Sequence, residues 1–132
     1  HEEVISLEKD IIQTDRAPAA IGPYSQAVRS GPWVFVSGQL PIDPESGRVI
    51  TGDIQAQTRR VLKNLEAILQ AAGASLDRVV KTTVYIANMD EFSKVNEAYA
   101  PFFPAKPPAR ACVEVARLPK DAGIEIEAVA LL

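Results

Sequence analysis

One arginine stands out for ligand chemistry because it begins an alternating run directly after two prolines. Arg110 follows the sequence Pro107-Pro108-Ala109, and the fixed φ angles of the prolines restrict the backbone that carries it. A planar guanidinium on a stiff segment suits two-point hydrogen bonding to a carboxylate. A salt bridge to a glutamate, at the surface or in an interface, is the more common local role for an arginine. Arg110 is therefore a candidate carboxylate clamp, with a structural ion pair as the alternative.

Two carboxylates are candidates for handling water. Glu125 and Glu127 lie two residues apart in an Ile-Glu-Ile-Glu segment, so a strand would point both side chains to one face. A carboxylate beside a buried cavity has a raised pKa and can orient or deprotonate water. Exposure on an edge strand is the more usual position for a glutamate. The spacing alone does not distinguish the two residues.

Several polar or small residues are candidates for lining a site. Tyr24 lies in a Gly-Pro-Tyr-Ser-Gln turn, where its ring would either pack on a flat ligand or be half buried in the core. Ser37 and Gly38 follow an apolar run, and a glycine lets the backbone approach a ligand closely. Asn96 would either reach a ligand or cap a neighbouring loop. Cys112 is interpreted as a small buried hydrophobe.

The composition excludes several classes of chemistry. The chain has one cysteine, and its one histidine is His1, so an internal disulfide, a Cys/His metal site and a histidine base are not expected. His1 is interpreted as a tag remnant or a processed terminus and is given no role. The net charge of −3 disfavours phosphate-driven nucleic-acid binding. The chain has neither a signal-peptide pattern nor an apolar stretch of about 20 residues, so we expect a reducing, aqueous compartment such as the cytoplasm.

The spacing of apolar residues predicts two helices. Between positions 53 and 72 they recur at helical intervals, with Asp53 or Thr51 as the start and Gly73 as a C-cap. A second helix begins near Asp90, and prolines at 101 and 104 close it. The apolar face of this second helix comprises Phe92, Val95 and Tyr99.

The remaining segments predict strands. Residues 34–36 are apolar on both faces, as in a central strand. Alternation marks residues 110–115 and 124–129, and a further run has one face made of Val80, Thr82, Val84 and Ile86. The order predicts a single α+β domain over residues 1–132, with two helices packed on one face of a mixed sheet. The opposite face carries Arg, Glu, Lys and Tyr among apolar residues. It would be either solvated or, as we prefer, buried against other subunits.

Six sequence blocks occur together and in order between about Ile12 and Leu131. They are 19–27, 36–39, 80–84, 95–97, 108–115 and 118–128, the last containing Leu-Pro-Lys and Ile-Glu-Ile-Glu-Ala. Together they resemble the Rid/YjgF family, and within it the RidA branch of reactive intermediate deaminases. Residues 1–11 precede the match and are interpreted as an N-terminal extension or as tag-adjacent residues.

The resemblance implies a fold and a set of roles. It implies a chorismate-mutase-like fold and a homotrimer with a ligand cleft at each of three subunit interfaces. The family's carboxylate-binding arginine falls on Arg110. The glutamate that positions water falls on Glu125, which selects it over Glu127. The backbone carbonyl of Cys112 would hold the water or the imine nitrogen. The cleft would also be lined by Tyr24, Ser37, Gly38 and Asn96, with no metal or organic cofactor.

The implied activity is hydrolytic deamination of 2-iminobutanoate and 2-iminopropanoate to 2-keto acids and ammonia. The alternative is a non-enzymatic protein that binds small carboxylates, or regulates, through the same clefts. A third interpretation attached to the family, a ribonuclease or translation inhibitor, is disfavoured by the acidic composition and the absence of an internal histidine. The expected location is the cytoplasm, or an organelle if a transit peptide has been removed.

Overall fold

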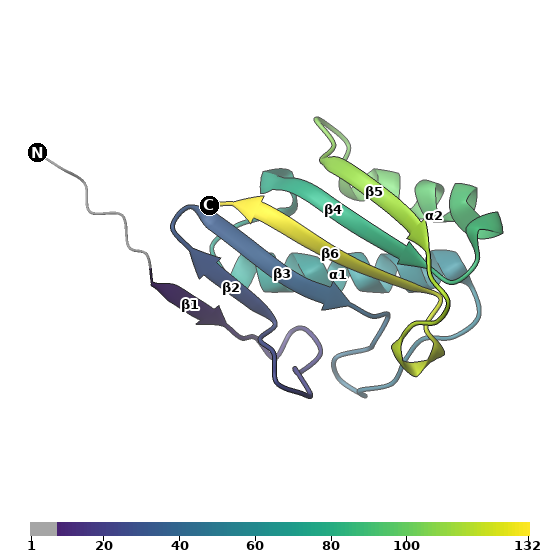
Figure 1. The fold of residues 1–132 in the computed structure, drawn as a ribbon, viewed down its shortest axis with the longest axis horizontal. Coiled ribbons are helices and arrows are strands. Elements are labelled where there is room, and N and C mark those ends of the chain that lie inside the picture. The colour runs from purple at the N-terminus through teal and green to yellow at the C-terminus, as the bar shows by residue number, and fades with distance from the viewer. Residues whose placement is uncertain (1–7) are drawn as a thin grey trace, which may run out of the picture.

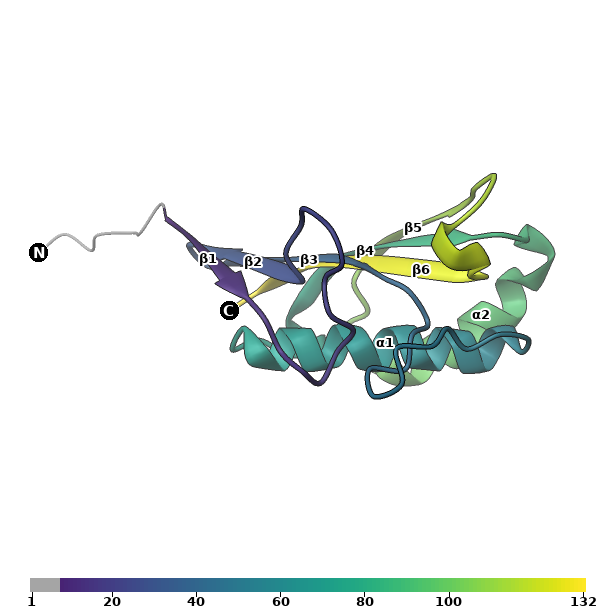
Figure 2. The same cartoon turned by 90° about the horizontal axis from the view of Figure 1, so that it is seen from below.

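A sheet and two helices form two layers (Figures 1 and 2). The computed structural model describes residues 8–132. The strands are β1 Lys9–Ile12, β2 Ala27–Ser30, β3 Trp33–Gln39, β4 Val79–Ile86, β5 Ala109–Glu114 and β6 Ile124–Leu131. The helices are α1 Ile54–Ala71 and α2 Phe92–Tyr99, with short 3-10 turns at Leu76–Arg78, Met89–Glu91, Ala100–Phe102 and Pro119–Asp121. The strand order is β1-β2-β3-β6-β4-β5, and only β4 and β5 are parallel. The predicted α+β architecture, a mixed sheet with both helices on one face, is confirmed.

Helix α1 begins and ends where its capping residues predict. The Asp53 carboxylate accepts a hydrogen bond from the Gln55 N–H at 3.1 Å, which satisfies one of the free amides of the first turn. Gly73 follows the helix with φ of 87°, a left-handed conformation that glycine adopts without a steric penalty. The side chains that α1 buries against the sheet include Val61, Leu62, Leu65, Ile68 and Leu69.

The covered face of the sheet is the apolar core. The even-numbered residues of β6 are at most 4% exposed and lie opposite the buried Val34 and Val36 of the central strand β3. The prediction that Val80 shares a face with Thr82, Val84 and Ile86 is wrong. Val80 is 37% exposed, whereas Val79 is 6% exposed, because the register shifts between Val79 and Lys81. This bulge leaves Val80 as an extra residue that points away from the core.

No helix among residues 8–132 covers the other face of the sheet, and loop residues cover only part of it, around Glu125. Glu125 and Glu127 share this face, as predicted, and the aromatic side chains of Trp33 and Phe35 are 42% and 48% exposed on it. The sequence analysis also expected an arginine on this face. For Arg110 that expectation is wrong. Its position in the β4–β5 register turns its side chain toward the helix layer, as the next section describes.

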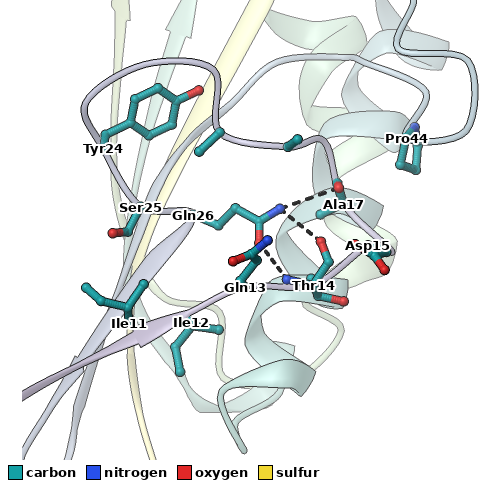
Figure 3. A pocket seen from close by; sticks show the side chains of 12 residues that line it. Ile11, Ile12, Gln13, Thr14, Asp15, Ala17, Tyr24, Ser25, Gln26 and Pro44 are labelled. Atoms are coloured by element: carbon teal, nitrogen blue, oxygen red, sulfur yellow. Dashed lines mark hydrogen bonds between the residues drawn. The ribbon is translucent and has the colours of Figure 1, made fainter.

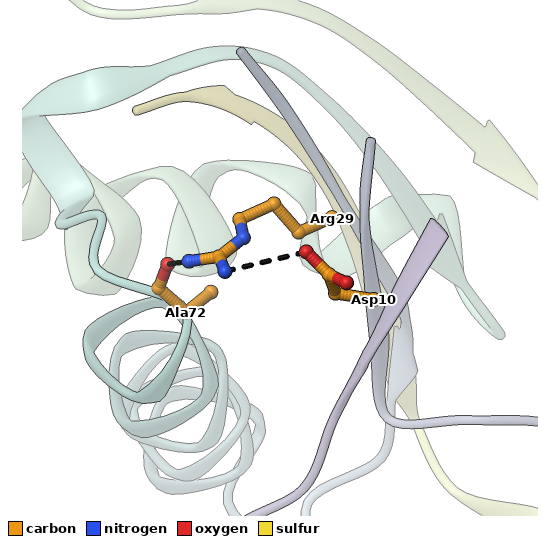
Figure 4. A network of polar contacts seen from close by, with 3 residues as sticks. All are labelled: Asp10, Arg29 and Ala72. Carbon is orange, nitrogen blue, oxygen red and sulfur yellow. Dashed lines mark hydrogen bonds and ion pairs between the residues drawn. The ribbon is translucent and has the colours of Figure 1, made fainter. Parts of the chain in front are cut away.

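Strand β1 pairs with β2 along its whole length, and one arginine adds a side-chain link between β1 and helix α1. Figure 4 shows Arg29 between two elements: Nη1 donates to the carbonyl of Ala72 at 3.3 Å, and Nη2 lies 3.3 Å from the Asp10 carboxylate. The first bond places a cation at the C-terminus of α1, where the helix dipole is negative. The folded domain therefore includes residues 9–11, which precede the sequence match. His1 and the stretch Val4–Leu7 lie outside the described residues.

Candidate functional site

Arg110 holds its guanidinium against the side chains of α2. The parallel register pairs Arg110 with the buried Thr82, which points both side chains toward the helix layer. The Arg110 Cζ atom lies 5.4 Å from the centroid of the Phe92 ring and 4.9 Å from that of Tyr99. Its Nη1 donates a 2.7 Å hydrogen bond to Asn96 Oδ1. Two rings and one amide therefore fix the plane of the guanidinium.

The groups around Arg110 are neutral. Burial raises the pKa of Tyr99, against the opposing effects of a 2.7 Å hydrogen bond with Thr82 and the Arg110 charge. Burial also raises the pKa of the Cys112 thiol, and the Arg110 charge opposes it. Cys112 is partly buried and packs against the core, as predicted for a small hydrophobe. Its thiol is therefore poorly suited to act as a thiolate.

The salt-bridge alternative for Arg110 finds no support among the residues that the structure describes. Over residues 8–132 the ion pairs are Arg29–Asp10 and Arg117–Asp121, and neither involves Arg110. A positioned guanidinium without a carboxylate partner in this described part of the chain is suited to bind the carboxylate of a ligand.

Glu125 lines a separate cavity of about 460 Å³ on the other face of the sheet. Tyr24, Ser37 and Gly38 line it as well, so four of the predicted site residues lie together here. The apolar part of its wall comprises Pro18, Ala19, Ile21, Leu40, Ile42 and Pro119. Burial, and secondly the charge of Glu127, raises the pKa of Glu125. A carboxylate with this pKa is a better proton acceptor than an exposed glutamate.

Geometry distinguishes Glu125 from Glu127, which spacing alone does not. Glu127 accepts a short hydrogen bond from the hydroxyl of Tyr85 on the neighbouring strand and does not line the cavity. This bond is the main reason that the pKa of Tyr85 is raised, with burial second. Glu127 is therefore held by a tyrosine, whereas Glu125 faces the cavity.

The segment 37–38 is shaped around Glu125. The Ser37 N–H donates to the Gln26 carbonyl at 2.9 Å, and its hydroxyl donates to the Ser25 carbonyl at 2.5 Å. A Cβ atom at Gly38 would lie 2.2 Å from Glu125 Oε2 and 2.8 Å from its Cδ. Any side chain at position 38 would therefore displace the carboxylate.

We expect Gly38→Ala to slow a reaction that uses the Glu125 carboxylate by about 100-fold with little loss of stability, because a displacement of about 1 Å at a reacting group costs that much. Only the end of a flexible side chain must move, so the fold survives. The measurement is kcat/KM beside the melting temperature. A fully active Gly38→Ala protein would show that the position of Glu125 is unimportant.

The two groups of site residues do not meet within one chain. Arg110, Asn96 and Cys112 belong to the helix side of the β5 edge, whereas Glu125 faces the uncovered side of β6. Strand β4 lies between β5 and β6 (Figure 1). None of the three residues near β5 lines the Glu125 cavity. The candidate site residues thus form two separate groups, the Arg110 half-site and the Glu125 half-site.

Three residues near the two half-sites were not predicted as site residues from the sequence. Phe92 and Tyr99 were assigned only to an apolar helix face, yet with Asn96 they are spaced four and three residues apart and form the side that contacts Arg110. That spacing was the available signal. Lys120 lines the Glu125 cavity with φ of 57°. The Leu-Pro-Lys block drew attention to this residue, but no site role was predicted for it.

Two further classes of feature are absent from the described part of the chain. Residues 8–132 contain no cluster of three or more His, Cys, Asp or Glu side chains arranged to hold a metal ion. Across the same residues, neither helix has the length and apolar character needed to cross a bilayer.

The fold defines a small α+β domain whose two groups of candidate site residues lie on opposite faces of the sheet, and comparisons with known proteins give its family. The family model described as Endoribonuclease L-PSP matches residues 14–132. A RutC family protein of Pyrococcus abyssi is 54% identical over 124 residues, covering 94% of this chain and 98% of that protein. The 2-iminobutanoate/2-iminopropanoate deaminase of Salmonella typhimurium is 52% identical over 123 residues, covering 91% and 95%. The crystal structure of E. coli TdcF with bound serine aligns with a TM-score of 0.90 at 48% identity, covering 93% and 98%. The chain belongs to this family, also called the Rid/YjgF family.

Proposed function

We propose that this protein hydrolyses reactive 2-imino acids, such as 2-iminobutanoate and 2-iminopropanoate, to 2-keto acids and ammonia. The observation that carries the proposal is the Arg110 guanidinium, which is fixed by two rings and an amide and has no carboxylate partner among residues 8–132. The Salmonella relative, 52% identical, bears the name of this activity.

The reaction needs a clamp, a water and a proton acceptor. Arg110 pairs with the substrate carboxylate and thereby orients the C=N carbon. Glu125, whose pKa is raised by burial, accepts a proton as a water oxygen attacks that carbon. The backbone carbonyl of Cys112 helps to hold the water. Glu125 returns this proton to nitrogen, which gives a carbinolamine. It then accepts the proton of the new hydroxyl group and passes it to the amino nitrogen. The C=O bond forms as the C–N bond breaks, its electron pair leaves on ammonia, and the keto acid remains. Positioning contributes much of the acceleration, and no cofactor is invoked.

The separation of the half-sites implies that the cleft forms between copies of the chain. We place Arg110, Asn96 and Cys112 of one copy opposite Tyr24, Ser37, Gly38 and Glu125 of the next. The uncovered sheet face, with the exposed Trp33 and Phe35, is the surface that such an assembly would bury. A closed ring of three copies fits the family expectation and would give three equivalent clefts.

The second candidate is a binding or regulatory protein that uses the same clefts for small carboxylates. The bound serine of E. coli TdcF favours it, since serine carries a carboxylate and is not an imine. An assay separates the two: a dehydratase generates 2-iminobutanoate, and semicarbazide traps what remains. An enzyme lowers the trapped fraction at substoichiometric amounts of protein. A binder does so only in proportion to its concentration, and that result would overturn the proposed activity. We further propose that the protein works in the cytoplasm.

A further inference from the structure

A buried carboxamide near the Glu125 cavity has no role in the chemistry proposed above. Gln26 is 3% exposed and directly follows the Tyr24-Ser25 segment. Burial of an amide is unfavourable unless its donors and acceptor are satisfied. The partners of Gln26 therefore indicate what it holds.

The Gln26 side chain binds a segment of backbone twelve residues earlier in the chain. Its Oε1 accepts a 2.7 Å hydrogen bond from the Thr14 N–H. Its Nε2 lies within hydrogen-bond distance of three carbonyls: Thr14 at 3.0 Å, Pro18 at 2.8 Å and Ala17 at 3.4 Å. Figure 3 shows the side chain reaching across to this segment. The Gln26 carboxamide thus supplies hydrogen-bond partners to the backbone of residues 14–18, as a neighbouring strand would.

Gln26 also separates two cavities. One is the Glu125 cavity, and the other, of about 410 Å³, lies beside β1 (Figure 3). Ala19, Tyr24 and Gln26 line both, so the chain from 18 to 26 is a wall with space on either side. Tyr24 is 52% exposed and has little packing of its own to hold it there. A segment with open space on both sides makes few packing contacts, so hydrogen bonds must hold it in one position.

We propose that Gln26 is a positioning residue that fastens this wall and so sets which ligand side chains fit the Glu125 cavity. The backbone carbonyl of Gln26 also accepts the Ser37 N–H at 2.9 Å, which links the same residue to the segment beside Glu125. One residue therefore connects the Tyr24 wall with the Ser37-Gly38 floor. The proposal rests on the proposed function only for the identity of the ligand.

Gln26→Met is the test because it keeps the shape of the side chain and removes its hydrogen bonds. The Tyr24 amide, bonded to the Gly22 carbonyl at 2.9 Å and not to Gln26, reports on the wall. We expect its hydrogen exchange to accelerate by at least about 10-fold. We also expect the ratio of Kd values for 2-oxobutanoate and 4-methyl-2-oxopentanoate to change by roughly 5-fold, because the cavity wall discriminates side chains by shape.

Two controls separate positioning from a general loss of stability. Gln70→Met is the same chemical change at an exposed glutamine, which accepts a 2.9 Å hydrogen bond from Arg16 in the same segment. Leu69→Ala opens the core at a residue that lines neither of the two cavities beside Gln26. Neither should alter the Kd ratio. Unchanged Tyr24 exchange together with an unchanged Kd ratio in Gln26→Met would overturn the proposal. Neither hydrogen exchange nor ligand binding requires catalysis. An inactive wild-type protein would therefore refute the proposed function, and these two measurements would still decide the role of Gln26.

Discussion

Arg110→Ala is expected to lower kcat/KM for 2-iminobutanoate by about 100-fold or more, which corresponds to roughly 3 kcal/mol for two lost hydrogen bonds to a charged group. The guanidinium is already oriented by Phe92, Tyr99 and Asn96, so its geometry is prepared before the substrate arrives. Without it the substrate carboxylate has no fixed partner. The measurement is the semicarbazide-trapping assay across a range of imine concentrations.

Two further variants of Arg110 separate charge from packing. Arg110→Lys keeps the positive charge and loses the planar, two-point geometry, so we expect it to recover only part of the activity. Arg110→Met keeps the aliphatic stem against the rings and is expected to be as inactive as the alanine variant. Circular dichroism and the melting temperature verify that each variant folds. Full activity in Arg110→Ala would remove the carboxylate clamp from the mechanism.

Glu125→Gln is expected to reduce kcat by about 100-fold, because general-base catalysis contributes at least that much. The amide preserves the size of the side chain and cannot accept the proton from water.

In the wild-type protein, activity should fall as the pH drops through the raised pKa of Glu125, since the protonated form is inactive. This acid limb should lie above the range of an ordinary glutamate and be absent from the variant's residual rate. Glu127→Gln, which alters the carboxylate held by Tyr85, serves as the matched control and should retain most of the activity.

The raised pKa of Glu125 also predicts how the free energy of unfolding depends on pH. Burial raises the pKa of Glu125 in the folded chain, so the folded chain binds more protons than the unfolded chain between the ordinary and the raised pKa. The stability contributed by this carboxyl is present below that window and is lost as the pH rises through it. Glu125→Gln should flatten this part of the curve of unfolding free energy against pH. An unchanged curve would show that Glu125 is not held in a buried environment.

Much of the fold followed from local patterns. Helix α1 was predictable because its apolar spacing, the Asp53 cap and Gly73 all indicate one element. The strand alternation in β6 correctly placed Glu125 and Glu127 on one face. The error at Val80 has a physical cause, since a bulge inserts a residue without any change in composition.

The site was less predictable because it depends on which strand edges and faces meet. The sequence indicated Arg110 but not the Phe92 and Tyr99 rings that hold it, since they also fit a core helix face. The choice of Glu125 came from family resemblance, and the Tyr85–Glu127 bond supplies a structural reason for it. Periodicity alone did not indicate that Arg110 and Glu125 lie on opposite faces, because that depends on the parallel pairing of β4 and β5.

The central claim, that one cleft combines Arg110 of one copy with Glu125 of another, is tested most directly by mixing two inactive variants. Arg110→Ala and Glu125→Gln chains are unfolded together in equal amounts, refolded and assayed for imine hydrolysis. In a closed ring with random mixing, about one quarter of the clefts receive both an intact Arg110 and an intact Glu125. We therefore predict that the mixture recovers about one quarter of the wild-type activity. Activity no higher than the mean of the two separately refolded variants would contradict a shared cleft.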